Sequence, residues 1–377
     1  MKNAYVKIYD IDENYLGMFT DFVFTSFVSS INGGLGDLKV VIPRKFDEYD
    51  QAQIELGNEL RIYIADTDAP SGTLVYSGEI DSIDASVSDN EDVSINCSGY
   101  VYQLALDVHE DSQTVYFKYT SEELADIVKD VIDKYNITNP QARINYTADS
   151  VTDTGKTKTL EVFLDTPLEV LFSVIRLSDS DWYFHIDATN TLYFQEIPTT
   201  PTHYFTFGKD IVSLNYNRNT RDTKTGILFS NGLTTLDEDV VFKLYKDDTA
   251  VTNYGRRFER IRDERYVEDG ADELGARLLS LYSEPINTVT LRVVDNNLDN
   301  GYDIESIKVG DTCKVLNTSE IPALTDNMLI TTIQYGFDYV DITVIDRNKY
   351  IERSLQEMRN TYNMFAFSDN LPTAYTV

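Results

Sequence analysis

The sequence contains few of the residues on which metal centres and nucleophilic enzymes depend. Its 377 residues include two cysteines, three histidines and one tryptophan. Cys97 and Cys313 lie far apart in strand-like runs without CxxC or Cys/His spacing, which favours buried free thiols over a disulfide. No HExxH motif occurs, so we expect structural or surface roles for His109, His185 and His203. We therefore nominate no catalytic residue, cofactor site or metal site.

Long apolar runs are also missing. No stretch of 18 apolar residues occurs, and the opening MKNAYVKIYDIDENYL has no apolar run behind Lys2. The sequence therefore predicts neither a secretion signal nor a membrane anchor.

Positive charge is scarce. Sixty-three acidic residues oppose 32 basic ones, which gives a formal net charge of -31. Such a surface repels polyanions unless one basic face is segregated, and the sequence shows no such face. The densest basic stretch is YGRRFERIRDERYVED, whose arginines Arg256, Arg257, Arg260, Arg262 and Arg265 (the arginine strip) are balanced by Glu259, Asp263, Glu264, Glu268 and Asp269. An ion-pair strip, within or between subunits, is favoured over a nucleic-acid site.

Two glycine-containing motifs do not meet the requirements of a nucleotide site. Gly155-Lys156-Thr157 ends a phosphate-loop-like run, but Ser150 stands where the loop needs its first glycine, so we expect a polar loop. INGGLGD at 31–37 lacks the dinucleotide fingerprint and precedes a strand, so we expect a turn.

Acidic and aromatic motifs also have simple structural interpretations. Asp295, Asp299 and Asp303 lack the spacing of a helix-loop-helix calcium site, which favours a solvated loop, with adventitious calcium as the alternative. Trp182 and Tyr183 could stack on a sugar, but the alternation in DWYFHID favours packing on a sheet face. Carboxylates are so abundant that the sequence singles out no acid/base pair.

The length allows two or three domains with separate cores. Residues 1–105 are strand-like runs rich in Tyr, Val, Ile, Thr and Phe between Gly, Asn, Asp and Pro breaks, which predicts a first β-barrel. Residues 106–207 predict an α+β insert. Residues 208–239 and 301–350 predict a second β-barrel, interrupted by a helix-containing segment at 240–300, and 351–377 predict a C-terminal helix or tail.

Helix signals mark the insert clearly. Thr120 and Glu123 predict an N-terminal cap, and apolar residues at helical spacing continue to Pro140. A second helix follows Thr166, with Pro167 in its first turn and Glu169 completing a capping box. DWYFHIDATNTLYFQE predicts two strands around an Ala-Thr-Asn turn. Further along, Asn231-Gly232 predicts a tight turn, and a third helix is expected near 270–284.

Part of the sequence repeats. ELGNELRIYIAD at 55–66 aligns with KVGDTCKVLNTS at 308–319, which matches Gly57 with Gly310 and Asn58 with Asp311. The next strands keep register, since Ile80 corresponds to Ile330, and the third strands alternate alike in Val93, Ile95 and Cys97 and in Val340, Ile342 and Val344. This predicts a duplicated β-domain, although strand composition is degenerate and chance similarity is the alternative.

The order of these segments resembles a known family. Five segments together resemble the baseplate hub and tail-associated proteins of tailed bacteriophages, over nearly the whole chain. They are LVYSGEIDSIDASV, VSINCSGYVYQL, TPLEVLFSVIRLSDSDWYFHIDATNTLYFQE, YGRRFERIRDERYVEDGADELGARLLSLYSEP and VGDTCKVLN. The resemblance implies a mainly β fold with α+β inserts: two similar tube-like β-barrels, an intervening α/β domain and a second inserted segment with a helix. It also implies a homotrimeric ring of approximate sixfold symmetry that continues the tail tube.

The expected function is structural and not enzymatic. We expect a virion protein, made in the host cytoplasm, at the distal end of the tail, whose partners are distal-tail or tail-tube proteins, the tape measure protein and receptor-binding proteins. An acidic channel would let DNA pass without binding it. Only 351–377 follow the last predicted strand, too few for a lytic domain. The alternatives are a cell-wall glycosidase with paired carboxylates and a carbohydrate-binding module that uses Trp182.

Overall fold

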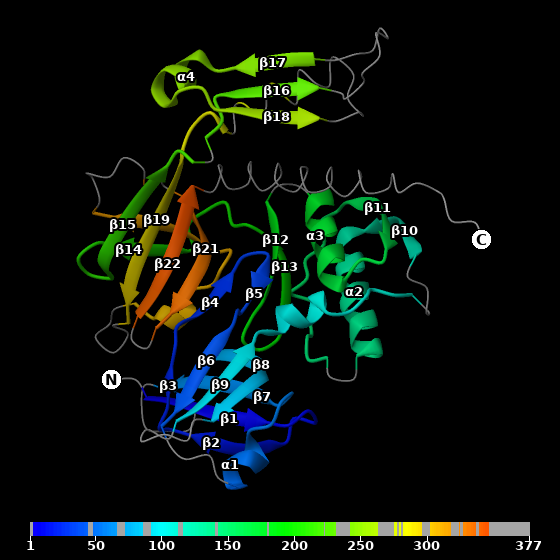
Figure 1. Ribbon diagram of the computed structural model, residues 1–377, viewed down its shortest axis with the longest axis vertical. Helices are drawn as coiled ribbons and strands as arrows, with labels where there is room; N and C mark the ends of the chain where they lie inside the picture. Colours follow the sequence, from blue (N-terminus) through cyan, green and yellow to red (C-terminus); the bar gives the residue numbers. More distant parts are fainter. Residues whose placement is uncertain are drawn as a thin grey trace. The chain divides into compact units, whose positions relative to one another are not determined.

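The computed structural model describes residues 3–43, 48–65, 72–85, 92–111, 116–139, 142–178, 181–221, 223–230, 242–262, 275–276, 279, 282–295, 302–317, 324, 327–336 and 339–346. The chain divides into two compact units. Unit 1 consists of Met1–Leu214 and Thr290–Val344, and unit 2 of Asn215–Val289 and Ile345–Val377. Each unit is described by itself (Figure 1).

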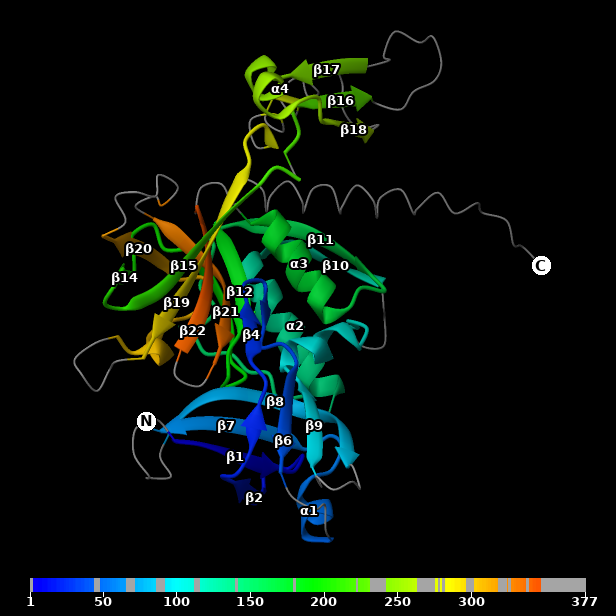
Figure 2. The ribbon, with the colours of Figure 1, turned by 60° about the vertical axis from the view of Figure 1, so that its left-hand side comes forward.

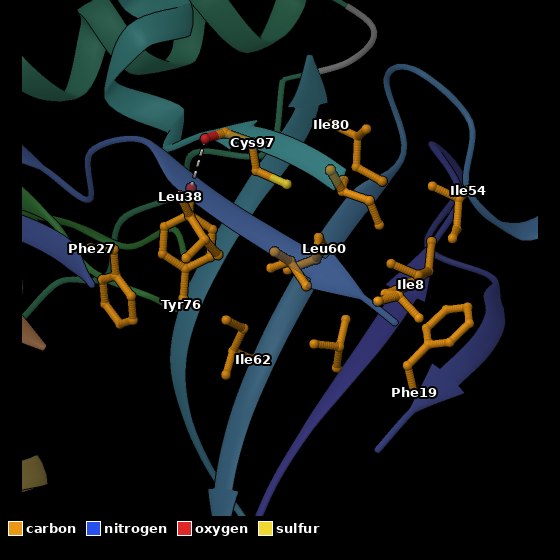
Figure 3. Packing of buried hydrophobic residues seen from close by; sticks show 14 of the residues in the cluster. Ile8, Phe19, Phe27, Leu38, Ile54, Leu60, Ile62, Tyr76, Ile80 and Cys97 are labelled. Carbon is orange, nitrogen blue, oxygen red and sulfur yellow. Dashed lines mark hydrogen bonds between the residues drawn. The ribbon is translucent and has the colours of Figure 1, made fainter. Parts of the chain in front are cut away.

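A seven-stranded sheet forms the first part of unit 1. Its order is β2-β1-β7-β8-β9-β6-β3, with β1 at Asn3–Tyr9, β2 at Tyr15–Phe19, β3 at Val23–Phe24, β6 at Leu38–Ile42, β7 at Glu59–Ala65, β8 at Thr73–Ala85 and β9 at Val93–Ser98. Apolar residues alternate along these strands and point to one core, as a period of two requires (Figure 3). In this core the hydroxyl of Tyr76 donates to the carbonyl of Cys97 over 3.3 Å.

Two short helices in this region differ from the all-β expectation. Glu48–Gln53 form the helix α1, and Tyr100–Ala105 form the 3-10 helix η1 where a strand was predicted. Tyr100, Gln103 and Leu104 are buried together, so the apolar spacing that suggested a strand belongs to helical turns.

The α+β segment follows. Strands β10 (Tyr116–Glu123) and β11 (Thr157–Phe163) form an antiparallel ribbon, and helices α2 (Leu124–Thr138) and α3 (Pro167–Leu177) pack against each other (Figure 1). The capping box of Thr166 and Glu169 is confirmed, as is the hairpin of β12 (Trp182–Ile186) and β13 (Leu192–Glu196). The predicted Thr120 cap is wrong: β10 continues to Glu123, whose carboxylate caps α2 by accepting from the Ala125 amide.

A second sheet contains strands from distant parts of the sequence. Its order is β14-β20-β21-β22-β19-β15, and β4 (Phe27–Ser30) also pairs with β21. The strands are β14 at His203–Thr206, β15 at Ile211–Asn219, β19 at Ile286–Val294, β20 at Thr312–Leu316, β21 at Met328–Tyr335 and β22 at Tyr339–Asp346. The predicted fold class, mainly β with α+β inserts, is confirmed.

The chain passes into unit 2 along β15 and returns along β19. Unit 2 contains β16 (Gly226–Ser230), β17 (Phe242–Lys246), β18 (Phe258–Arg262) and the helix α4 (Asp248–Tyr254). The strand β16 therefore lies in the inserted unit and β19 mostly contributes to the second sheet, whereas the sequence placed them the other way round. The division into the predicted domains otherwise stays a prediction. Asn231-Gly232, most of 270–284 and all of 351–377 lie outside the described residues.

The two large sheets repeat one arrangement. Strands β7, β8 and β9 correspond to β20, β21 and β22 and are adjacent in the same order. Gly57 has φ +83° and donates to the carbonyl of Ile80 at 3.0 Å, and the Ile80 amide donates to the carbonyl of Asn58 at 2.9 Å. Gly310 has φ +87° and makes the matching bond to Ile330 at 2.9 Å.

The second repeat completes the same pattern, because the Ile330 amide donates to the carbonyl of Asp311 at 2.9 Å. The residues that the sequence alignment matches thus make the same backbone hydrogen bonds in both repeats. One difference lies beside the repeat: β1 runs antiparallel to β7, whereas β14 runs parallel to β20.

The matched glycines give a test of this arrangement. Gly57→Ala should cost about 1–2 kcal/mol of unfolding free energy, because alanine is strained at positive φ. Gly310→Ala should cost about 1–3 kcal/mol more, since its Cβ would lie 2.2 Å from the ring of Tyr183, whereas the nearest atom at Gly57 is 3.9 Å away. Urea unfolding of both variants measures the difference, and equal losses would contradict the close packing at Gly310.

Candidate functional site: the segment that joins the repeated sheets

One short segment connects three sheets of unit 1. Residues 23–42, the joining segment, begin in the first sheet as β3, pair with β21 of the second sheet as β4 and pair with β12 as β5 (Gly33–Gly34). They return to the first sheet as β6, beside β9. Figure 2 shows this blue stretch of chain between the sheets.

Side chains reinforce these backbone pairings. Phe27 is 1% exposed; its ring stacks on Tyr335 of the second sheet and meets Tyr76 of the first edge-on, both at 4.9 Å between centroids. The amide of Gln334 donates to the hydroxyl of Ser26 at 2.6 Å. The two repeats therefore share aromatic packing at this segment.

The glycines of INGGLGD are part of the joint. The sequence predicts a turn here, and Ile31 and Asn32 do form one, but Gly33 and Gly34 then pair as a short parallel strand with β12. A Cβ at Gly34 would lie 2.9 Å from the carbonyl oxygen of Ile186, so the missing side chain is what lets the two backbones approach.

A buried ion cluster connects the first sheet with the α+β segment. The Glu59 side chain is 0% exposed and its Oε2 lies 2.6 Å from Arg61 and 2.5 Å from Arg143. Asn190 donates to its other oxygen at 3.2 Å, and the hydroxyl of Ser77 lies 2.6 Å from the Asn190 amide oxygen. This pairing offsets the cost of burying the carboxylate and positions the β12–β13 turn.

Electrostatic interactions in this cluster favour the charged form of Arg61. Burial alone would lower the pKa of Arg61, but hydrogen bonding to and attraction by Glu59 raise it above its ordinary value. Burial, followed by the charge of Glu59, raises the pKa of Tyr100. Arg61 thus stays protonated beside the carboxylate.

Removing the carboxylate charge tests the cluster. Glu59→Gln should lower the free energy of unfolding by about 3 kcal/mol or more, because Arg61 and Arg143 would lose their buried counter-ion. Glu13→Gln is the control: Glu13 lies 3.9 Å from Arg61 but is 68% exposed, so its loss should cost below about 1 kcal/mol. Similar losses in guanidinium unfolding would contradict the structural role of Glu59.

The three histidines have structural surroundings. His109 is buried with Nε2 2.9 Å from the hydroxyl of Tyr119, which donates to Asp130 at 2.6 Å, so Nε2 carries the hydrogen. His203 lies between Tyr302 and Asp311, 2.9 Å from the latter. The expected structural roles fit this geometry.

His185 has the most isolated environment of the three. It is buried between the rings of Tyr183 and Tyr193, and its Nδ1 makes no hydrogen bond. Burial, with repulsion from Lys308, lowers its pKa from 6.5 to about 4, although Asp187 and Asp311 act in the opposite direction. It is therefore neutral at pH 7.

This burial makes stability depend on pH. The unfolded chain binds a proton at His185 below pH 6.5, whereas the folded chain does so only near pH 4. The stabilisation that comes from a neutral His185 is therefore fully present above pH 6.5. It is lost as the pH falls to 4, which lowers the free energy of unfolding by about 3 kcal/mol. Urea unfolding across this range should show a smaller loss for His185→Phe than for the wild type, and parallel curves would contradict a buried neutral histidine.

Other candidates from the sequence lie apart from one another. Trp182 is half-buried and packs on Phe194 at 4.9 Å between ring centroids, as sheet packing predicts. Lys156 lies in a loop before the strand β11, which is not phosphate-loop topology. Asp303 caps the 3-10 helix at Ile304–Ser306, and Asp299 lies outside the described residues.

Both cysteines are buried and free, as predicted. Burial raises the pKa of Cys313 to about 12 and that of Cys97 further, so neither thiol is a nucleophile at neutral pH.

The arginine strip is only partly described, and among the described residues no ion pair joins Arg256, Arg257 or Arg260 to Glu259. Glu259 pairs instead with Lys224 at 2.7 Å. Arg257 donates to the carbonyls of Tyr254 and Thr220, and Arg256 lies over the ring of Phe258. The alternation of β18 points Glu259 and Arg260 to opposite faces, which explains why these neighbours do not pair. An ion-pair strip within or between subunits stays a prediction. Arg265 and the acids after Glu259 lie outside the described residues.

An acidic group at the start of α2 could in principle hold a cation. Oxygens of Glu123, Asp126 and Asp153 lie within 4.8 Å of one another. Glu123 is already engaged by the amides of Ala125 and Thr154, and Lys129 pairs with both aspartates. These bonds account for the arrangement without an ion.

Within the described residues, no helix is both long and apolar enough to span a membrane.

The structural similarities point to one group of proteins. The 43 kDa tail protein of prophage MuSo2 from Shewanella oneidensis matches with a TM-score of 0.66 and 15% identity, over 93% of this chain and 98% of that one. The fold is that of phage tail proteins. A tail protein from Neisseria meningitidis matches with a TM-score of 0.57 and 12% identity, over 93% and 98% of the two chains.

A third similar structure is the prophage tail protein gp18 from Listeria monocytogenes, with a TM-score of 0.51 and 13% identity over 94% of this chain and 98% of that one. No family model and no curated protein matches the sequence. The resemblance to phage tail proteins is thereby confirmed at the level of the fold.

Proposed function

We propose that this chain is a structural component of a phage-type tail, the baseplate hub at its distal end. The observation that carries the proposal is the atomic match of the two repeats, at Gly57 with Ile80 and at Gly310 with Ile330, in a chain that has the tail-protein fold. A chain with two like β-units supplies six units when three copies assemble. A homotrimer could thus meet a hexameric tail tube with matching symmetry.

The joining segment supports this function mechanically. Ring subunits must hold their two β-units at one spacing, and the pairing of residues 27–30 with β21 fixes both repeats within unit 1. The buried Glu59 cluster adds a second connection, to the α+β segment. On this basis the partners are distal-tail or tail-tube proteins, the tape measure protein and receptor-binding proteins, and the protein resides in the virion.

The net charge fits a conduit for DNA. Lys/Arg patches on a channel wall would bind the DNA phosphates and slow the passage of DNA, whereas an acidic wall repels the duplex. With a net charge of -31, the assembled protein should not bind duplex DNA even at low salt. The function is non-enzymatic, because the work lies in assembly.

The solution mass tests the proposal. Light scattering at several concentrations should give a mass three times that of the 43.0 kDa chain. A monomer at every concentration would contradict ring formation by this chain alone. Cleavage of peptidoglycan that disappears on substituting one carboxylate would instead favour the glycosidase.

A further inference from the structure

The small sheet of unit 2 has one covered face and one open face. Its register places Ile227 and Phe229 on the covered face, where they pack with Tyr245, Ile261, Leu279 and Tyr282. Residues directly opposite across neighbouring strands share a face. The intervening residues of the three strands therefore lie together on the other side.

This other side, the open face, is apolar at its centre. Leu228 lies opposite Leu244 on one strand and opposite Arg260 on the other. Phe242 and Leu244 are 67% and 50% exposed, and Phe258 covers Gly226. Exposed large apolar residues grouped on one sheet face are typical of a surface that binds another protein.

Two arginines border this apolar centre. Arg260 is on the open face itself, and Arg256 lies 4.9 Å from the ring centroid of Phe258. Both are exposed, and neither has a carboxylate partner within the described part of the chain. Arginines that meet no carboxylate among the described residues, beside exposed apolar side chains, are unusual on a chain with a net charge of -31.

We propose that the open face binds an acidic surface of a second copy of this chain. The inference rests on the proposed ring. Copies that each carry a large negative charge repel one another unless exposed cations of one copy meet carboxylates of the next. A closed ring of three needs a head-to-tail contact between two different surfaces, and a basic-apolar face against an acidic surface is of that kind.

Charge reversal and apolar removal test the two halves of the contact separately, in the full-length chain. The first variant is Arg256→Glu with Arg260→Glu, and the second is Phe242→Ser with Leu244→Ser. Exposed positions such as these seldom affect folding, which circular dichroism and the Tm would check. The matched controls are Lys118→Glu with Lys158→Glu on the exposed β10–β11 ribbon, and Ile137→Ser, at a residue that is 82% exposed.

Light scattering and sedimentation should show that each open-face variant raises the dissociation constant of the trimer about tenfold or more, whereas the controls leave it unchanged. Added salt should weaken the wild-type trimer and have less effect on the arginine variant. If the wild type is a trimer and both open-face variants remain equally stable trimers, this inference is overturned, whereas the proposed ring is not. A wild type that is monomeric throughout would overturn the ring, and the inference with it.

Discussion

Backbone pairing by residues 23–42 with three sheets is the constraint on which the rest of unit 1 depends. A strand normally satisfies its hydrogen bonds within one sheet, but this segment divides its amides and carbonyls among the first sheet, β21 and β12. An unpaired buried peptide group costs about as much as a lost hydrogen bond. The segment therefore cannot leave one sheet without exposing or orphaning groups in another, and it holds the repeats together as one body.

The two copies of the β-unit share their backbone geometry but contact different neighbouring segments of the chain. Both copies keep the glycine turn and its reciprocal bonds, which depend only on backbone geometry. The next residue differs: Glu59 is buried against two arginines, whereas Thr312 at the equivalent position is buried and donates to the carbonyl of Thr200 at 2.7 Å. The core pattern is kept, and the side chains at the strand entrance set which neighbouring segment each repeat binds.

Local signals in the sequence predicted local structure well. Alternation located most strands, and the spacing of Thr166 and Glu169 located a helix start, because both depend on residues within a few positions. The repeat was found because its register spans three strands. Thr120 was misjudged as a cap because pairing between β10 and β11 extends that strand, which is a non-local effect.

The candidate site was less predictable for the same reason. The sequence around Glu59 does not show that Arg143 and Asn190 of the α+β segment will hydrogen-bond to its carboxylate. Likewise, INGGLGD has the composition of a turn and begins with one, and only the approach of Ile186 shows that its first two glycines form a strand. The open face of unit 2 depends on which strands pair with β16, and the sequence had assigned β16 to a different part of the fold.

Two like β-units, held at a fixed spacing by residues 23–42, should let three chains form a ring of six. Electron cryo-microscopy of the purified assembly tests it most directly. We expect six similar sheets around one axis, in which those bearing Gly57 alternate with those bearing Gly310 at a common radius. A threefold assembly in which the two repeats lie at clearly different radii, or face different directions, would contradict it.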